Sequence, residues 1–262
     1  PLNQRGNICT YNFYKDTIHE LDLGISYTEM AIGKFIGNED GEELIVAELF
    51  RTEQKEDGTT VEIPATATLY RVNDSRYVMC SQINIDKTFV RYVSATVGPV
   101  DQGTNAFVLD GVKADNTVQT ELLYWSSSAK SLITYPLVES TAEANATLRN
   151  TASNVFARDI NKDGLLEIPT ASFFPGADSE NSSQTSFRIS WNRFDVANQE
   201  YLLVMDTVVN SEYGYFLQLP DEWRDLVTVR TSGRILSVYA WNNELADIGE
   251  RILKITVYPE EQ

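Results

Sequence analysis

The stretch from residue 159 to 169 reads DINKDGLLEIP and carries oxygen side chains at its first, third, fifth and ninth positions. Calcium in proteins takes roughly six to eight oxygen ligands, and alternate residues of a tightly turning loop can point toward a single ion. The stretch therefore predicts a calcium site. Its expected ligands are four side chains and one backbone carbonyl, from Asp159, Asn161, Asp163, Glu167 and Leu165 respectively.

The local sequence excludes an EF-hand. An EF-hand loop of about twelve residues lies between two helices and closes with a bidentate Glu at its last position. The corresponding residue here is Thr170, and Pro169 disfavours a helix at this point. The flanks 154–157 and 171–174 are apolar and predict short strands, and Gly164 can take the positive φ that reverses the chain. We expect a strand–loop–strand site.

This pattern resembles the loops of FG-GAP/VCBS repeats, and the resemblance is close over residues 155–174. It implies a β-propeller in which the loop joins the first two strands of a blade and binds a structural Ca²⁺. It also implies an exported protein that is extracellular or displayed on the cell surface, where millimolar calcium fills modest sites. A solvated Asp-Gly turn without metal is the alternative for the same residues.

Glycine-containing turns recur along the chain. Gly41, Gly103 and Gly164 each follow an apolar segment and precede another, at intervals of about 60 residues. The first copy, 36–41, keeps Asn38 and Asp40 but has Ile36 in place of the leading Asp, and the second, 100–105, has lost most ligands. The loops at 36–44 and 100–106 are expected to keep their turns, and whether they bind metal stays open.

Each repeat continues with an alternating hairpin, because period-two runs of β-branched and aromatic residues bounded by polar turns predict paired strands. The predicted pairs are 68–70 with 77–80, 122–125 with 132–135, 187–191 with 201–205, and an opening pair, 9–14 with 18–23. Four strands per repeat is the anatomy of a propeller blade. The prediction is an all-β propeller segment of four-stranded blades over 1–212, starting mid-blade and forming an open arc.

From residue 213 the pattern changes, which predicts a small C-terminal α+β or capping unit over 213–262. Residues 219–226 resemble a short helix with Pro220 near its start, and strands are expected at 227–231, 235–241 and 251–258. The polar stretches 51–64 and 175–185 are expected to be exposed insertions.

Composition restricts the function. The 262 residues carry a formal net charge of −17, which disfavours nucleic acid as a partner. No run of 18 or more apolar residues is present, so no membrane span is predicted.

The chain begins at Pro1 without a signal peptide, which suggests a processed product with a possible lipid anchor upstream. Cys9 and Cys80 are the two cysteines, and either a disulfide or two separate thiols fits them.

The sequence offers no recognisable catalytic constellation. His19 is the single histidine and lies in an alternating strand among acidic residues, and there is no Gly-x-Ser-x-Gly elbow or phosphate-binding loop. The expected function is non-catalytic binding or scaffolding, with an unknown protein or glycan as ligand. The alternative is a carbohydrate-active propeller enzyme or its binding module, since the 38 acidic residues contain many possible pairs. The four tryptophans, Trp125, Trp191, Trp223 and Trp241, are expected mainly in core packing, with Trp223 partly exposed.

Overall fold

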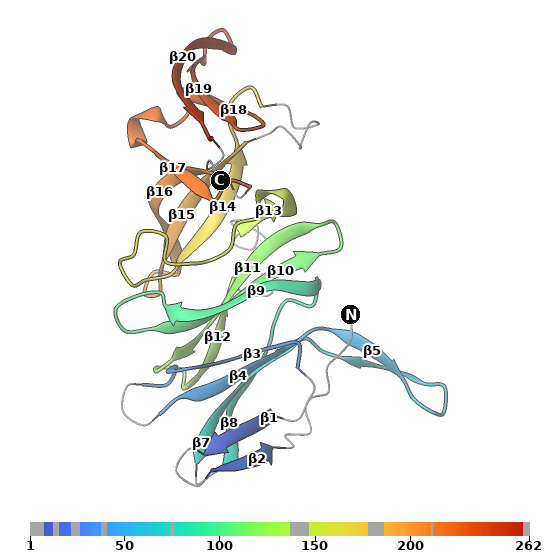
Figure 1. The fold of residues 1–262 in the computed structure, drawn as a ribbon. Helices are drawn as coiled ribbons and strands as arrows, with labels where there is room; N and C mark the ends of the chain where they lie inside the picture. Colours follow the sequence, from blue (N-terminus) through green and yellow to red (C-terminus); the bar gives the residue numbers. More distant parts are fainter. Residues whose placement is uncertain are drawn as a thin grey trace.

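The structure is a computed structural model that describes residues 8–12, 16–21, 27–37, 41–73, 76–136, 147–177, 186–210 and 212–258. In these ranges the fold is all-β, with no α-helix and only short 3-10 turns such as η2 (Thr151–Ser153) and η3 (Asp221–Trp223). The strands form several antiparallel sheets that follow one another along the molecule in chain order (Figure 1). This confirms the all-β prediction. The described strands do not close into a barrel or a ring.

Four sheets make up the body, and we number them in chain order. The first sheet has the order β3-β4-β7-β8, formed by Glu29–Gly33, Glu43–Glu48, Thr66–Asn73 and Arg76–Asn84. The second has the order β9-β10-β11-β12, formed by Phe89–Pro99, Asn105–Lys113, Thr117–Ser126 and Ser131–Tyr135, and β13 (Arg149–Asn150) pairs with β11. The third has the order β14-β15-β16-β17, formed by Glu167–Phe173, Phe187–Asp195, Glu200–Asn210 and Tyr215–Leu219. The fourth has the order β18-β19-β20, formed by Val227–Ser232, Ile235–Asn242 and Asp247–Thr256.

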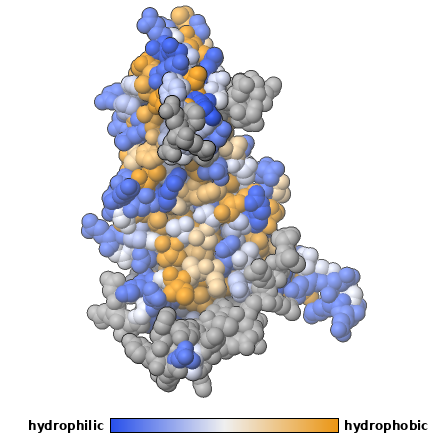
Figure 2. Space-filling view, viewed as in Figure 1, coloured by the Kyte–Doolittle hydropathy of each residue, from blue (hydrophilic) through white to orange (hydrophobic). Residues whose placement is uncertain are grey.

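The predicted hairpins are confirmed. They correspond to β7–β8, β11–β12 and β15–β16, and to a separate pair of β1 (Ile8–Asn12) and β2 (Thr17–Leu21). The stretch 51–64 is exposed as expected but is no irregular loop, because β5 (Arg51–Gln54) and β6 (Thr60–Ile63) pair within it. This hairpin projects from the stack and carries mainly hydrophilic side chains (Figures 1 and 2). Most of 175–185 lies outside the described residues.

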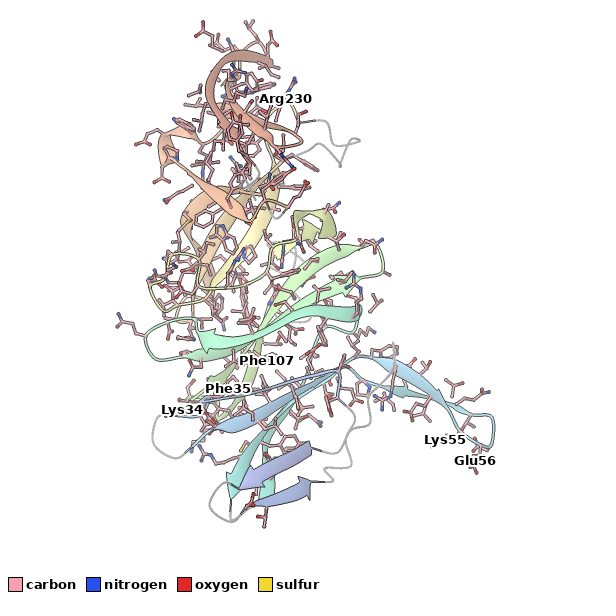
Figure 3. The ribbon with its side chains drawn as sticks, in the orientation of Figure 1. Lys34, Phe35, Lys55, Glu56, Phe107 and Arg230 are labelled. Atoms are coloured by element: carbon pink, nitrogen blue, oxygen red, sulfur yellow. The ribbon has the colours of Figure 1, made fainter. Side chains whose placement is uncertain are left out.

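Successive sheets pack face to face, with each repeat laid over the next. Strand β3 lies against β9, and β8 lies against β12. The first strand of one sheet thus packs on the first strand of the next, and the last strand packs on the last. One apolar core separates the first and second sheets and contains Phe35 and Phe107 (Figure 3). A second core, with Ile168 and Phe194, lies between the second and third sheets, and a third, with Leu236, lies between the third and fourth. The strands β10 and β11 are therefore buried on both faces.

A buried ion pair ties the second sheet to the segment that leads into the third. The guanidinium of Arg149 lies 2.7 Å from Asp110 Oδ1, and neither side chain is appreciably exposed. Arg149 also donates to the carbonyl of Val155, and the second oxygen of Asp110 accepts the N–H of Ala157 at 3.2 Å. A buried charge is tolerated when it is paired and hydrogen-bonded in this way.

A second buried polar group lies between the first and second sheets. Glu121 on β11 is 2% exposed, and it accepts hydrogen bonds from the Thr134 hydroxyl at 2.5 Å and the Asp86 N–H at 3.3 Å. Burial raises the pKa of Glu121 to about 7, with Asp86 adding to the rise and Lys113 opposing it. The hydroxyl of Tyr92 in this region is buried, and no described residue hydrogen-bonds to it.

The C-terminal segment differs from the α+β unit that the sequence predicts. The helix expected at 219–226 is a single 3-10 turn, η3, whose N-cap position is Pro220 and lacks a side-chain capping bond. The three strands after it are confirmed as the fourth sheet. The boundary predicted between 212 and 213 falls in the turn between β16 and β17, which are paired strands of one sheet. No helix in the described ranges is long and apolar enough to cross a membrane.

Candidate metal site

The predicted calcium loop lies at the entrance to the third sheet. Arg158 and Glu167 form an isolated antiparallel bridge, in which each N–H donates to the other's carbonyl at 3.1 and 2.9 Å. The loop of 159–166 closes between these two residues, and Glu167 begins β14. The strand predicted after the loop is confirmed, although it begins at Glu167. The segment 154–157, also predicted as a strand, has no regular secondary structure, and Asn154 at its start is in the left-handed conformation.

The loop is organised by its own oxygen side chains. Asp159 accepts the N–H groups of Asp163 at 3.1 Å and Gly164 at 2.9 Å, and Asn161 Oδ1 accepts the Asp163 N–H at 2.9 Å. Asp163 Oδ1 accepts the N–H of Leu165, also at 2.9 Å. Gly164 has φ of 89°, as the sequence predicted for a reversal. Four of the five predicted ligands are therefore gathered in one turn.

Glu167, the fifth predicted ligand, is the most unusual group of the site. It is fully buried, and its Oε2 accepts the N–H of Ile160 at 3.0 Å. Its Oε1 is buried and has no hydrogen-bond partner among the residues that the structure describes. Burial raises the pKa of Glu167, and the negative charges of Asp163 and Asp159 raise it further. An unpartnered buried carboxylate oxygen costs free energy unless a cation or a proton satisfies it.

Asp163 has a basic neighbour. Arg193 on β15 lies 3.0 Å from Asp163 Oδ2, and both side chains are more than a third exposed. The Leu165 N–H is the main cause of a lowered pKa at Asp163, with smaller contributions from Asn161 and Arg193. Because the ion pair is exposed, it contributes little to stability, on the order of 1 kcal/mol or less.

The first repeat contains an equivalent glutamate that is fully satisfied. Glu43 begins β4 as Glu167 begins β14, it is also buried, and its Oε2 accepts the Phe35 N–H at 2.8 Å. Its Oε1 pairs with Arg71 at 3.2 Å. Arg71 is the cross-strand neighbour of Glu43, and Arg193 holds the same position opposite Glu167.

The first and third repeats differ in what their cross-strand arginine bonds to. Arg71 satisfies its glutamate, whereas Arg193 bonds to Asp163 through Nη2, and both Arg193 Nε and Glu167 Oε1 are left without a partner among the described residues. This pairing was not predicted from the sequence. The signal for it was an arginine 28 residues after Glu43 and another, Arg193, at a similar spacing after Glu167.

The register also corrects the alignment of the first loop. Gly33 pairs with Glu43 as Arg158 pairs with Glu167, so the residue in the place of Asp159 is Lys34 and not Ile36. Asn38 and Asp40 lie outside the described residues.

The second loop is a short turn. In it Asp101 Oδ1 accepts the N–H groups of Gly103 and Thr104 at 2.8 and 2.7 Å. This agrees with the prediction that its turn persists.

Hydrogen bonds join the described residues of the three turns between neighbouring sheets. Asn105 donates its side-chain N–H to the carbonyl of Lys34 at 2.6 Å, which joins the second turn to the first. The N–H of Leu166 donates to the carbonyl of Pro99 at 2.7 Å, which joins the third turn to the second. The repeated glycine spacing in the sequence thus corresponds to a repeated position in space.

The residues of the third loop are chemically suited to calcium but are not arranged as a finished cage. Within the described ranges, no three His, Cys, Asp or Glu side chains stand close enough together to hold an ion as placed. The carboxylates of Asp159 and Asp163 instead accept backbone N–H groups of the loop. The donor set of carboxylate, amide and carbonyl oxygens and the unpartnered Glu167 Oε1 together fit a hard cation.

The remaining residues named from the sequence are the cysteines, the histidine and the tryptophans. The side chains of Cys9 and His19 lie outside the described residues, so neither can be placed. Cys80 is a free, partly exposed thiol. Trp191 is fully buried, as expected of a core residue, and Trp125, Trp223 and Trp241 are all partly buried, so Trp223 is not distinguished from the other two.

No model of a known protein family matches this sequence. The curated proteins also contain no match.

Proposed function

We propose that the loop of 159–167 binds a structural Ca²⁺. Glu167 carries the proposal, because a fully buried carboxylate with one unpartnered oxygen lies beside Asp159 and Asp163. The ligands would be the side chains of Asp159, Asn161, Asp163 and Glu167 and the carbonyl of Leu165. The ion would offset the repulsion among three carboxylates and connect the loop to the first residue of β14.

We further propose that the chain is a non-catalytic scaffold or binding segment, built of FG-GAP/VCBS-like propeller blades in an open arc. Three observations support this. The first three sheets are antiparallel meanders, neighbouring sheets are laid over one another, and hydrogen bonds join the described residues of their equivalent turns. An extracellular or cell-surface location accords with calcium binding, since millimolar calcium fills modest sites there. A lipid anchor upstream and a protein or glycan ligand belong to the same proposal.

Carbohydrate hydrolysis is the competing function, and the lining of one groove bears on it. A groove of about 420 Å³ lies between residues 154–158 and the ends of β16 and β17. Its described lining contains no Asp or Glu. Glycoside hydrolases generally need two carboxyl groups across the cleft. This groove suits binding better than hydrolysis.

Thermal unfolding in calcium and in chelator tests the metal proposal. We expect calcium to raise the melting temperature, because a ligand at about 100 times its Kd adds about 2.7 kcal/mol to the free energy of unfolding. Glu167→Gln should have two effects of opposite sign. It should stabilise the protein in chelator, because it removes a buried charge, and it should abolish most of the gain from calcium.

Asp163→Ala provides a second test, and Asp115→Ala provides its control. Asp115 is an exposed turn residue whose carboxylate accepts the N–H of Thr117, so its removal perturbs a similar turn far from the loop. We expect Asp163→Ala to lose the calcium-induced gain and Asp115→Ala to keep it. An identical melting temperature in calcium and chelator for the unmodified protein would rule out the structural ion.

A further inference from the structure

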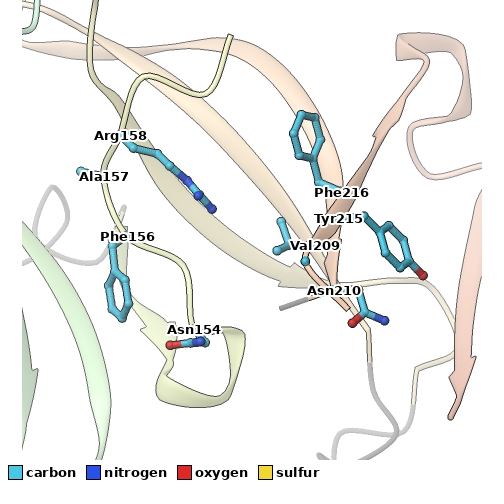
Figure 4. A pocket seen from close by; sticks show the side chains of 9 residues that line it. Asn154, Phe156, Ala157, Arg158, Val209, Asn210, Tyr215 and Phe216 are labelled. Atoms are coloured by element: carbon cyan, nitrogen blue, oxygen red, sulfur yellow. The ribbon is translucent and has the colours of Figure 1, made fainter. Parts of the chain in front are cut away.

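The groove beside the calcium loop combines aromatic, amide and guanidinium groups. It lies between the segment 154–158 and the turn end of the β16–β17 hairpin, where Val209 pairs with Phe216 (Figure 4). Its volume of about 420 Å³ falls in the range of small-molecule sites, roughly 300–1,000 Å³. Phe156 and Phe216 contribute rings to the lining, and Phe216 is 47% exposed.

Arg158 is the only charged residue in the described lining of the groove. Its backbone is fixed by the bridge to Glu167, and its guanidinium carbon lies 5.3 Å from the ring centre of the buried Trp191. Figure 4 shows the side chain reaching across the groove toward Val209. An arginine held by stacking on an indole loses little conformational freedom when it binds a ligand.

Arg158 also lacks the acidic partner that other arginines nearby possess. Arg193 pairs with Asp163, and Arg188 and Arg224 pair with carboxylates of their own. Within the described residues no carboxylate lies within ion-pair distance of Arg158. Arg158 therefore presents a guanidinium that no carboxylate of the described residues neutralises. Its fork of N–H donors matches a carboxylate.

Two amide side chains complete the site. Asn154 lines the groove and its side chain makes no hydrogen bond within the described part of the chain. Asn210 accepts the N–H of Tyr213 at 3.0 Å and its side chain also bonds to the Tyr215 hydroxyl, which together fix its orientation. Its NH₂ group carries two N–H donors, so one is left for a ligand. Amides beside aromatic rings suit the hydroxyls and C–H faces of a sugar. The excess negative charge of the protein is screened beyond about 8 Å at physiological salt, so it does not prevent an anion from binding at the groove.

We propose that this groove binds an acidic sugar, with the carboxylate of a hexuronate on Arg158, hydroxyls on Asn154 and Asn210, and a ring face against Phe216. This assigns a ligand class to the proposed binding role and rests on it, but it does not depend on calcium. The calcium proposal is judged by melting temperature without sugar, so the two proposals can fail separately.

Methyl glucuronide and methyl glucoside form a matched pair of probes, since they differ only in the carboxylate. We expect the glucuronide to bind at least about tenfold more tightly in a titration followed by NMR, because a charge-assisted bidentate contact is lost with the glucoside. Arg158→Gln should remove this preference, and Phe216→Ala should weaken both ligands. Arg230→Gln changes an exposed arginine on the distant fourth sheet and should have no effect (Figure 3).

Three outcomes would overturn the proposal. They are equal affinity for the two sugars, an unchanged preference in Arg158→Gln, and binding of neither sugar at concentrations up to about 10 mM. A short peptide with a free C-terminal carboxylate is the comparison ligand. If the peptide binds through Arg158 and the glucuronide does not, the sugar class is wrong. The glucuronide titration is repeated in calcium and in chelator. We expect equal affinity in the two, which excludes an ion that bridges the sugar to the loop.

Discussion

The buried carboxyl of Glu121 should make the stability of this protein fall as the pH rises. Glu121 is 2% exposed and accepts hydrogen bonds from the Thr134 hydroxyl and the Asp86 N–H, and burial raises its pKa from 4.5 to about 7. Below pH 4.5 the carboxyl is protonated in both the folded and the unfolded chain, so it imposes no penalty. Between pH 4.5 and 7 the unfolded chain ionises first, and the folded state loses relative stability.

The magnitude follows from the size of the pKa shift. Each pKa unit corresponds to about 1.4 kcal/mol, so a rise from 4.5 to about 7 amounts to about 3 kcal/mol lost by pH 8. The charged neighbours of Glu121 are Asp86 and Lys113, whose Oδ2 and Nζ atoms lie 3.5 Å apart. The charge of Asp86 raises the pKa of Glu121, and that of Lys113 lowers it. Tyr92 faces the same region, and its own pKa is raised by burial first and by the charges of Glu121, Asp86 and Glu29.

Urea denaturation at pH 5 and pH 8 measures this effect. Glu121→Gln removes the titration while keeping a carbonyl oxygen to accept hydrogen bonds, so we expect the variant to gain about 3 kcal/mol over the unmodified protein at pH 8 and much less at pH 5. Glu250→Gln, on exposed β20, is the control for the general change in net charge. The same difference between Glu121→Gln and the unmodified protein at both pH values would refute the reasoning.

Three further changes test other parts of the structure. Arg149→Leu should cost about 3–5 kcal/mol in urea denaturation because Asp110 is left as an unpaired buried charge, and adding Asp110→Leu should restore much of that loss; a cost below about 1 kcal/mol would contradict this. Gly111→Ala should cost about 1–3 kcal/mol because its Cβ would lie 2.4 Å from the ring of Phe89, and an unchanged urea midpoint would argue against such tight packing. Arg193→Gln should tighten calcium binding by about two- to fivefold in calorimetry, since it removes a cation from Asp163, whereas weaker binding would mean that Arg193 helps to form the site.

Strand content was predictable where apolar and polar residues alternate between short polar turns. The stretch 187–191, for example, alternates large apolar residues with Arg and Ser and predicted the hairpin β15–β16 from its sequence alone. The segment 219–226 shows where this reasoning failed. Its Pro, acidic residues and Trp223 satisfy helix-start rules, but the chain forms only one 3-10 turn before β18. Tertiary pairing of β17 and β18 with their neighbours outweighs such a weak local preference.

The turn of the candidate metal site was predictable from the sequence, but its electrostatics were not. The spacing of Asp159, Asn161 and Asp163 identified the loop, because it places the ligands on alternate positions of a tight turn. The unpartnered oxygen of Glu167 depends on how β15 pairs with β14, which brings Arg193 opposite Glu167. Glu167 and Arg193 are more than twenty residues apart in the sequence, and the whole sheet sets the register that pairs them.

The paired repeats also suggest how such an array changes over evolutionary time. In the first repeat a guanidinium, Arg71, satisfies the buried Glu43, whereas under our proposal an ion does so for Glu167 in the third. Both repeats keep the same backbone bridge and the same N–H donor to the glutamate. A duplicated unit can therefore exchange an ion for a side chain without altering its fold, and dependence on the calcium of the surroundings can be gained or lost one repeat at a time.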